Sequence, residues 1–235
     1  MSRIINVIGD VHGKTQQYQK MLREKYSESL TVQIGDMGIG FSGVTLEDDQ
    51  EMLSRGHRWF RGNHDDPAKC RTYKSYLGDW GYRPEDRLFW LAGAFSIDYL
   101  WRTPGRSWWH DEELSGEELN KAIEIYKTVK PDYFLSHEAP TEAAKYMLTV
   151  ALPSFRPEKL DCTMSRTSEA LQLMFDYHQP KEWVFGHYHA DKSFEWKGAK
   201  FTCVNELSVY SLEITDAPEE EKGSEKSSPA ILSGY

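Results

Sequence analysis

The sequence predicts a mixed α/β fold, and two observations carry this prediction. A β-branched run at residues 3–8 is followed by an amphipathic helical pattern at 15–25 and a second strand pattern at 29–34, which together form a strand–helix–strand unit. Both strand patterns end in Gly-Asp, and in open parallel sheets the ligand site lies at the carboxyl ends of the strands. We therefore expect polar residues from several strand ends to gather at one edge of the fold.

The remaining elements continue this alternation along the chain. Ser115 and Glu118 have the spacing of a helix capping box, and Pro131 closes that helix off. The elements expected after residue 45 are, in chain order, a helix over 46–54, a strand over 57–61, two strands meeting near Gly93 within 87–99, a helix over 115–129, a strand over 132–136, a weak helix over 141–151, irregular chain over 153–163, a helix over 167–178, a strand ending at 185, and a closing antiparallel set over 193–196, 201–204 and 209–214.

One domain is expected over residues 1–215. Apolar residues make up 39% of the chain and aromatic residues 13%, which is enough for one substantial core. From Asp216 onward the chain consists mainly of Glu, Lys, Ser, Pro and Gly, a composition that cannot bury a core. We therefore expect residues 216–235 to form a disordered acidic and serine-rich tail.

Charge and composition narrow the classes of function. The net charge of −9 argues against nonspecific electrostatic binding of nucleic acid, although it does not exclude a local basic groove. Three scattered cysteines without a C-x-x-C pattern indicate neither a disulfide framework nor a thiolate zinc site. No apolar segment approaches 18 residues, and the chain starts with a strand-like run instead of a signal peptide. A cytoplasmic protein without a membrane partner is expected.

Short polar motifs follow the first two predicted strands. Asp10 and His12 come after the first strand, and Asp36 comes after the second. On an extended segment, residues two apart point to the same side, so Asp10 and His12 would share one face. Carboxylates and imidazoles gathered at one edge are candidate metal ligands.

A further polar group follows the third predicted strand. Asn63, His64 and Asp65 lie directly after it. An Asx-type turn before a helix that starts near Pro67 would account for Asn63 and Asp66. It would not account for His64, which favours a functional role for this segment.

Histidines also end two later strands. His137 ends the strand over 132–136, and a lone histidine there is more often a satisfied polar side chain than a ligand. His187 and His189 follow Gly186, and on an extended segment they would point to the same side. An isolated pair of this kind is as often a surface feature as a metal site, so its weight comes from the other motifs.

The segment from Trp101 to Glu113 is rich in arginine and tryptophan. Arg102 and Arg106 beside a cleft would suit an anionic substrate, and a packed surface flap accounts for the composition equally well.

Taken together, five motif blocks closely resemble the calcineurin-like metallophosphoesterase superfamily over about residues 3–214. The resemblance implies an α/β/β/α sandwich of two mixed β-sheets flanked by helices, with the motifs on loops at one edge. The blocks are Asp10-Val11-His12, Gly35-Asp36, Gly62-Asn63-His64-Asp65, His137 and Gly186-His187-Tyr188-His189.

The resemblance also implies two divalent metal ions and their ligands. Mixed carboxylate, imidazole and amide ligands suit Mn²⁺, Fe or Zn²⁺ more than Mg²⁺ or Ca²⁺, and Mn²⁺ is the expected metal. Two such ions, about 3.5–4 Å apart, would hold a phosphoryl group and a bridging hydroxide that attacks phosphorus. The implied ligands are Asp10, His12 and His189 for one ion, Asn63, His137 and His187 for the other, and Asp36 bridging both.

His64 matches the catalytic histidine of the superfamily. It would protonate the leaving oxygen or bind a phosphoryl oxygen, and Asp65 or Asp66 would orient its ring. The protein Ser/Thr phosphatase branch follows its second aspartate with Asp-Arg-Gly, whose arginine grips phosphate. Here Met37 follows Asp36, so that arginine is absent, and Arg102 or Arg106 are the candidates to replace it.

The expected function is hydrolysis of a phosphate ester, with the substrate class left open. The opening motif looks like the protein-phosphatase branch, which favours a phosphomonoesterase. The third motif is more like the phosphodiesterase and nuclease branches, so a diesterase acting on cyclic nucleotides or nucleic acid is the alternative. A non-catalytic metal-binding scaffold that binds a partner is the alternative from another class.

Overall fold

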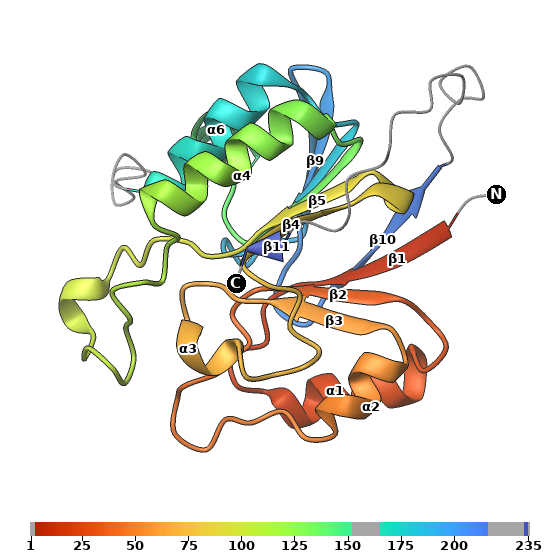
Figure 1. Cartoon of the computed structure of the whole chain (residues 1–235), viewed down its shortest axis with the longest axis vertical. Helices are drawn as coiled ribbons and strands as arrows, with labels where there is room; N and C mark the ends of the chain where they lie inside the picture. The colour runs from red at the N-terminus through yellow and green to blue at the C-terminus, as the bar shows by residue number, and fades with distance from the viewer. Residues whose placement is uncertain (1–2, 152–164, 216–232, 235) are drawn as a thin grey trace.

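The fold is described from a computed structural model that covers residues 3–151, 165–215 and 233–234. Two β-sheets pack against each other, and helices cover the outer face of each sheet (Figure 1). The outer helices of one side are α1 (Thr15–Lys25) and α2 (Asp49–Ser54), and those of the other side are α4 (Gly116–Val129) and α6 (Arg166–Tyr177). This arrangement confirms the α/β/β/α sandwich of two mixed sheets.

The smaller sheet has four strands in the order β10-β1-β2-β3. Strands β1, β2 and β3 are parallel, and β10 is antiparallel to β1. The strands are β10 (Val209–Ile214), β1 (Arg3–Ile8), β2 (Thr31–Ile34) and β3 (His57–Phe60).

The larger sheet has seven strands in the order β11-β4-β5-β6-β7-β9-β8. Its central strands β5, β6, β7 and β9 are parallel, β4 and β8 are antiparallel to their neighbours β5 and β9, and β11 pairs antiparallel with β4. The strands are β4 (Trp80–Arg83), β5 (Leu88–Leu91), β6 (Tyr133–Ser136), β7 (Glu182–Phe185), β8 (Lys192–Trp196), β9 (Ala199–Cys203) and β11 (Ser233–Gly234). The short helical segments are α3 (Pro67–Cys70), α5 (Thr141–Tyr146), the 3₁₀ turns Pro84–Asp86 and Tyr99–Trp101, and the π-helix Met147–Ala151.

Three apolar cores hold the layers together. Between the two sheets, strand residues such as Val7, Ile34 and Leu135 interdigitate and are fully buried. One outer core packs α4 and α6 on the larger sheet, and the other packs α1 and α2 on the smaller sheet. Because β1, β2, β6 and β7 are mostly buried on both faces, they do not alternate strictly between apolar and polar residues, although the buried polar residues Asn6 and Gln33 interrupt β1 and β2.

Two expectations for the sheets are wrong in part. The closing antiparallel set is divided, because β8 and β9 join the larger sheet while β10 pairs with β1 in the smaller one. Only one strand forms within 87–99, since the backbone of Gly93 has φ +84° and its N–H donates to the carbonyl of Arg61. This turn takes the chain out of the sheet and into the loop that follows.

The predicted tail after residue 215 falls mostly outside the described residues, as does the irregular segment 153–163. The exception is β11, in which Ser233 and Gly234 pair antiparallel with β4, so these two residues depart from the expectation. In the described part of the chain, the model has no helix that is both long enough and apolar enough to cross a membrane.

Candidate metal centre and active site

The predicted ligands converge where the two sheets meet. Asp10 and Asp36 follow β1 and β2 of the smaller sheet, and His137 follows β6 of the larger one. All three side chains are buried. The ring Nδ1 of His137 donates to the carbonyl of Ile34 at 2.9 Å, which joins the two sheets at the site.

The motif backbone is not extended, contrary to the prediction for the i and i+2 pairs. His12, His187 and His189 have φ values of +48°, +68° and +48°, in the left-handed region that costs energy for residues other than glycine. Asp36 shares this conformation, with φ +56°. Such strain gathers at functional sites, and here it sends His187 and His189 to different ligand groups.

One group consists of Asp10, His12 and His189. Its possible ligand atoms all lie within 4.8 Å of one another. Asp10 Oδ2 is 3.5 Å from His12 Nε2 and 3.0 Å from His189 Nε2, and the two Nε2 atoms are 2.8 Å apart. The structure therefore brings together the three residues assigned to the first metal ion.

A second group consists of Asp36, His137 and His187, with Asn63 beside it. His137 Nε2 lies 3.2 Å from Asp36 Oδ1 and 3.2 Å from Asn63 Oδ1. Because Nδ1 donates to Ile34, Nε2 carries the lone pair in the neutral ring. Three acceptors then face one another, an arrangement that requires a cation or a proton among them.

Asp36 stands between the two groups. Its Oδ1 lies on the His137 side and also accepts the backbone N–H of His64 at 2.8 Å. Its Oδ2 lies 3.8 Å from His12 Nε2. Each carboxylate oxygen therefore faces a different group.

The cluster perturbs the titration of its members. Burial raises the pKa of Asp10, but hydrogen-bond contacts from His12 and His189 outweigh it and lower that pKa to about 2. Burial lowers the pKa of His137, but Asp36 and Asp10 outweigh it and raise that pKa to about 10. Buried carboxylates need hydrogen-bond donors or compensating positive charge, and a metal ion also supplies positive charge.

The residues present fit divalent metal ions. Asp10 Oδ2 is buried and makes no hydrogen bond of good geometry within the described chain, although two imidazoles approach it. A Cβ atom at Gly62 would overlap with Asp36 and His137, so glycine at this position leaves the space that the ligands occupy. Carboxylate, imidazole and amide groups converging in this way are ligands for divalent transition metals.

His64 lies beside the cluster and contacts Arg102. The Arg102 guanidinium is 2.5 Å from His64 Nε2, and its Nε also binds Asp98 at 2.6 Å. Burial lowers the pKa of His64 to about 4, with Asp36 opposing this and Arg102 adding to it. Arg106 lies exposed on the same loop, so only one of the two candidate arginines reaches the site.

The structure places Asp65 differently from the expectation that it orients the His64 ring. Its buried carboxylate accepts the backbone N–H groups of four residues, at 2.7–3.1 Å. Asp66 instead caps α3 by accepting from Ala68 and Lys69. Asp65 thus ties the loop after β2 to the loop after β3. The four donors are Met37, Gly38, Ile39 and Gly62.

Several supporting residues are not evident from the sequence. Asn63 Nδ2 donates to Ser96 at 3.0 Å, and the Ser96 hydroxyl donates to the buried Glu112 at 2.6 Å. Glu138 Oε2 lies 3.6 Å from His187 Nε2, and the other carboxylate oxygen of Glu138, Oε1, accepts a hydrogen bond from the Tyr188 hydroxyl. The only signal for Glu138 is its position directly after His137, and Glu112 has none.

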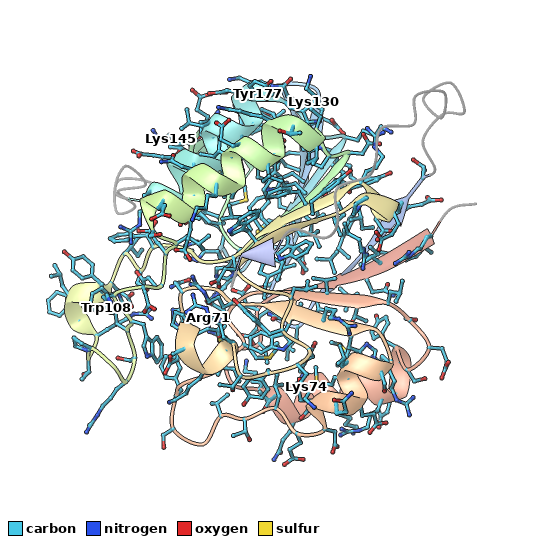
Figure 2. The ribbon with its side chains drawn as sticks, viewed as in Figure 1. Arg71, Lys74, Trp108, Lys130, Lys145 and Tyr177 are labelled. Atoms are coloured by element: carbon cyan, nitrogen blue, oxygen red, sulfur yellow. The ribbon has the colours of Figure 1, made fainter. Side chains whose placement is uncertain are left out.

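The loop that carries Arg102 projects from the body of the fold, and Figure 2 shows Trp108 on it. Trp101 on this loop is 90% exposed, whereas Trp109 is buried. The sequence allowed either a substrate-binding loop or a packed surface flap. The loop has features of both, because it lies at the surface and one of its arginines, Arg102, contacts His64.

The chain belongs to the calcineurin-like phosphoesterase family, whose model matches residues 4–191. This match spans every motif block from Asp10 to His189. It implies metal-dependent phosphoester hydrolysis, in agreement with the ligand geometry. No curated protein matches the chain.

Three solved structures to which the chain is similar are distant in sequence. A presumed 5′-nucleotidase from Staphylococcus aureus in complex with α-ketoglutarate is 14% identical, with a TM-score of 0.49 over 94% of this chain and 57% of the other. A predicted phosphoesterase from Streptococcus pneumoniae TIGR4 is 14% identical, with a TM-score of 0.39 over 92% and 85%. GAP50, the anchor in the inner membrane complex of Plasmodium, is 10% identical, with a TM-score of 0.43 over 87% and 71%. None is similar enough to transfer an activity.

Proposed function

We propose that the protein is a hydrolase that cleaves a phosphate ester with two divalent metal ions, and that these ions are Mn²⁺. The observation that carries the proposal is Asp36, whose two oxygens face two separate groups of candidate ligands. One group would hold each ion, and Asp36 would bridge them. Such a pair of ions, when bound, polarises a phosphoryl group and lowers the pKa of a water molecule.

The chain's own residues would orient the ester. His64 lies one residue after Asn63, beside His12, with ring centroids 5.0 Å apart. It is placed to contact the leaving oxygen or a phosphoryl oxygen. Arg102 fixes the His64 ring from the far side and brings positive charge to the same place. It stands in for the arginine that the Asp-Arg-Gly motif would supply.

The His137 ring is held in place by the smaller sheet. Its Nδ1–H is committed to the Ile34 carbonyl, so its Nε2 is the atom directed at the second ligand group. Asn63 is fixed in turn by Ser96 and Glu112. These contacts give the ligands a preset geometry, which a metal centre needs for rapid chemistry.

The experiment is metal removal and restoration. Purified protein is treated with a chelator, and turnover of phosphomonoesters, phosphodiesters and nucleic acids is measured before and after adding Mn²⁺. We expect activity to vanish after chelation and to return when Mn²⁺ is added. The screen then shows whether the protein prefers monoesters or diesters. Full activity after complete metal removal would contradict the proposal. For the substitution Asp36→Asn, the matched control is Asp176→Asn, which removes the charge of an exposed carboxylate on α6.

A further inference from the structure

A cavity of about 160 Å³ opens next to the proposed phosphate site. It shares two walls with that site, the rings of His12 and His64. Its other walls are the side chains of Phe41 and Val44 and glycine backbone at positions 13 and 38. A group linked through one oxygen to a phosphorus atom at the metal ligands would therefore extend into this cavity.

The walls of the cavity favour a flat apolar group. The ring of Phe41 lies nearly parallel to that of His64, with centroids 6.1 Å apart, and Trp109 contacts Phe41 edge-on at 5.6 Å. A further aromatic ring packs well at centroid separations of about 4.5–7 Å. Apart from the two histidine rings, no lining side chain can pair with a polar edge. A phenyl ring has no polar edge that needs such a partner.

The size of the cavity matches a single ring. Apolar cavities of about 150 Å³ are large enough to bind benzene. A two-ring group would have to leave part of its surface outside, in solvent. The volume, the apolar walls and the position beside His64 all indicate the same kind of ligand.

The cavity is set in place before any ligand binds. Asp65 holds the backbone of Gly38 and Ile39 through two N–H donors at 2.7 and 2.8 Å. A Cβ atom at Gly40 would come within 2.7 Å of the Trp109 ring, so the loop passes tightly against it. The backbone of Phe41 is then held by a hydrogen bond from its N–H to the carbonyl of Gly38. A wall built this way loses little freedom when a ligand binds, which raises affinity.

We propose that this cavity receives the aromatic ring of the ester's leaving group, so that the preferred substrate is a phosphate ester of a single-ring aryl alcohol. Small phenyl phosphates and phosphotyrosyl peptides share this chemistry. Phe41 and Val44 determine the preference. The inference rests on the proposed phosphoesterase function for the position of the phosphate.

The first test measures binding, independently of turnover. Phenylphosphonate and methylphosphonate, which lack a cleavable ester, are titrated into the Mn²⁺-loaded protein by calorimetry. We expect the phenyl compound to bind at least about tenfold more tightly, the usual scale for an apolar group in a fitted pocket. Phe41→Ala should bring the ratio of the two affinities toward one. Phe194→Ala, which removes another half-buried ring on β8, should preserve the ratio.

A second variant keeps the test valid if Phe41→Ala does not fold. Val44→Phe enlarges a side chain that lines the cavity, which reduces the space inside, and should also bring the affinity ratio toward one. Equal affinities for the two phosphonates in the unaltered protein would overturn the inference. So would a tenfold preference that survives both Phe41→Ala and Val44→Phe.

The turnover test separates this inference from the proposed function. Phenyl phosphate is compared with hexafluoroisopropyl phosphate, whose alcohol is of similar acidity, so the two esters differ mainly in shape. A higher kcat/KM for the phenyl ester supports the proposed role of the cavity. Turnover of a phosphotyrosyl peptide then shows whether the ring can come from a protein. Turnover without preference would overturn the cavity and leave the phosphoesterase intact. Selective phosphonate binding without turnover of any ester would support the cavity and reject the hydrolase.

Discussion

The two sheets contribute different chemistry to the same centre. The loops after β1, β2 and β3 of the smaller sheet supply both carboxylates, Asp10 and Asp36, together with His12 and Asn63. Among the proposed ligands, the loops after β6 and β7 of the larger sheet supply only imidazoles. The proposed carboxylate ligands therefore come from one sheet and most of the imidazole ligands from the other, with the carboxylate of Glu138 beside His187.

This division shows that neither sheet can form the site alone. The carboxylates of the smaller sheet would repel each other without the rings of the larger sheet or a cation between them. His137, by contrast, is buried against Asp10, Asp36 and the Ile34 carbonyl, all from the smaller sheet. Metal binding and docking of the two sheets should therefore be coupled.

The strongest test of this comparison is Asp36→Asn, because the two oxygens of Asp36 face different ligand groups. We expect kcat/KM to fall by at least about 1,000-fold, since two ions lose their shared ligand and its charge. His12→Ala, which removes a ligand from one group, should cost less. Turnover and metal content are measured for both variants. Small and equal losses would show that Asp36 does not bridge.

The next effect concerns His64, which lies beside both groups without belonging to the proposed metal ligands. His64→Ala should retain its metals and lose roughly 10²–10⁴ in rate on alkyl esters, the usual scale for a general acid. The loss should shrink for nitrophenyl esters, whose leaving groups need little protonation. An equal loss for all leaving groups would assign His64 to the phosphoryl oxygens. A variant that arrives without metal would reject both roles.

A smaller effect is expected from Glu112, which acts on the smaller sheet's amide ligand from a distance. Glu112→Gln should weaken metal binding by about 10–100-fold, because Ser96 would no longer hold Asn63 in place. Glu113→Gln is the matched control, since Glu113 is also buried but contacts the start of α6. Metal titration of the two variants gives the comparison. Equal metal affinities would show that Glu112 does not hold Asn63 in place.

The smallest expected difference is in stability and compares two imidazoles of the larger sheet. His137→Ala should lower the unfolding free energy by about 1–2 kcal/mol more than His189→Ala, because its loss leaves the buried Ile34 carbonyl without a donor. His189 has a half-exposed side chain, so water can take the place of its contacts with Asp10 and His12 of the smaller sheet. Denaturant unfolding of the metal-free proteins measures the difference. A greater loss for His189→Ala would contradict the coupling of the sheets.

Much of the fold was predictable because its elements are locally consistent. The helix over 15–25 was expected with its observed bounds, and the capping box of Ser115 and Glu118 is present. The partner of β10 was not predictable, since the strand pairs with β1 from the opposite end of the chain. A strand pattern shows which residues are apolar but not which sheet will bury them.

The sequence by itself determined which chemical groups are present and that they follow strands, because residue type and strand pattern are local properties. Only the tertiary structure decided how those groups combine. Left-handed backbone at His187 and His189 sends neighbouring histidines to different ligand groups, and Asp65 binds backbone amides instead of the His64 ring. Arg102 reaches His64 from 38 residues further along the chain. These contacts depend on how two sheets meet and how one loop folds back, and no local pattern encodes either.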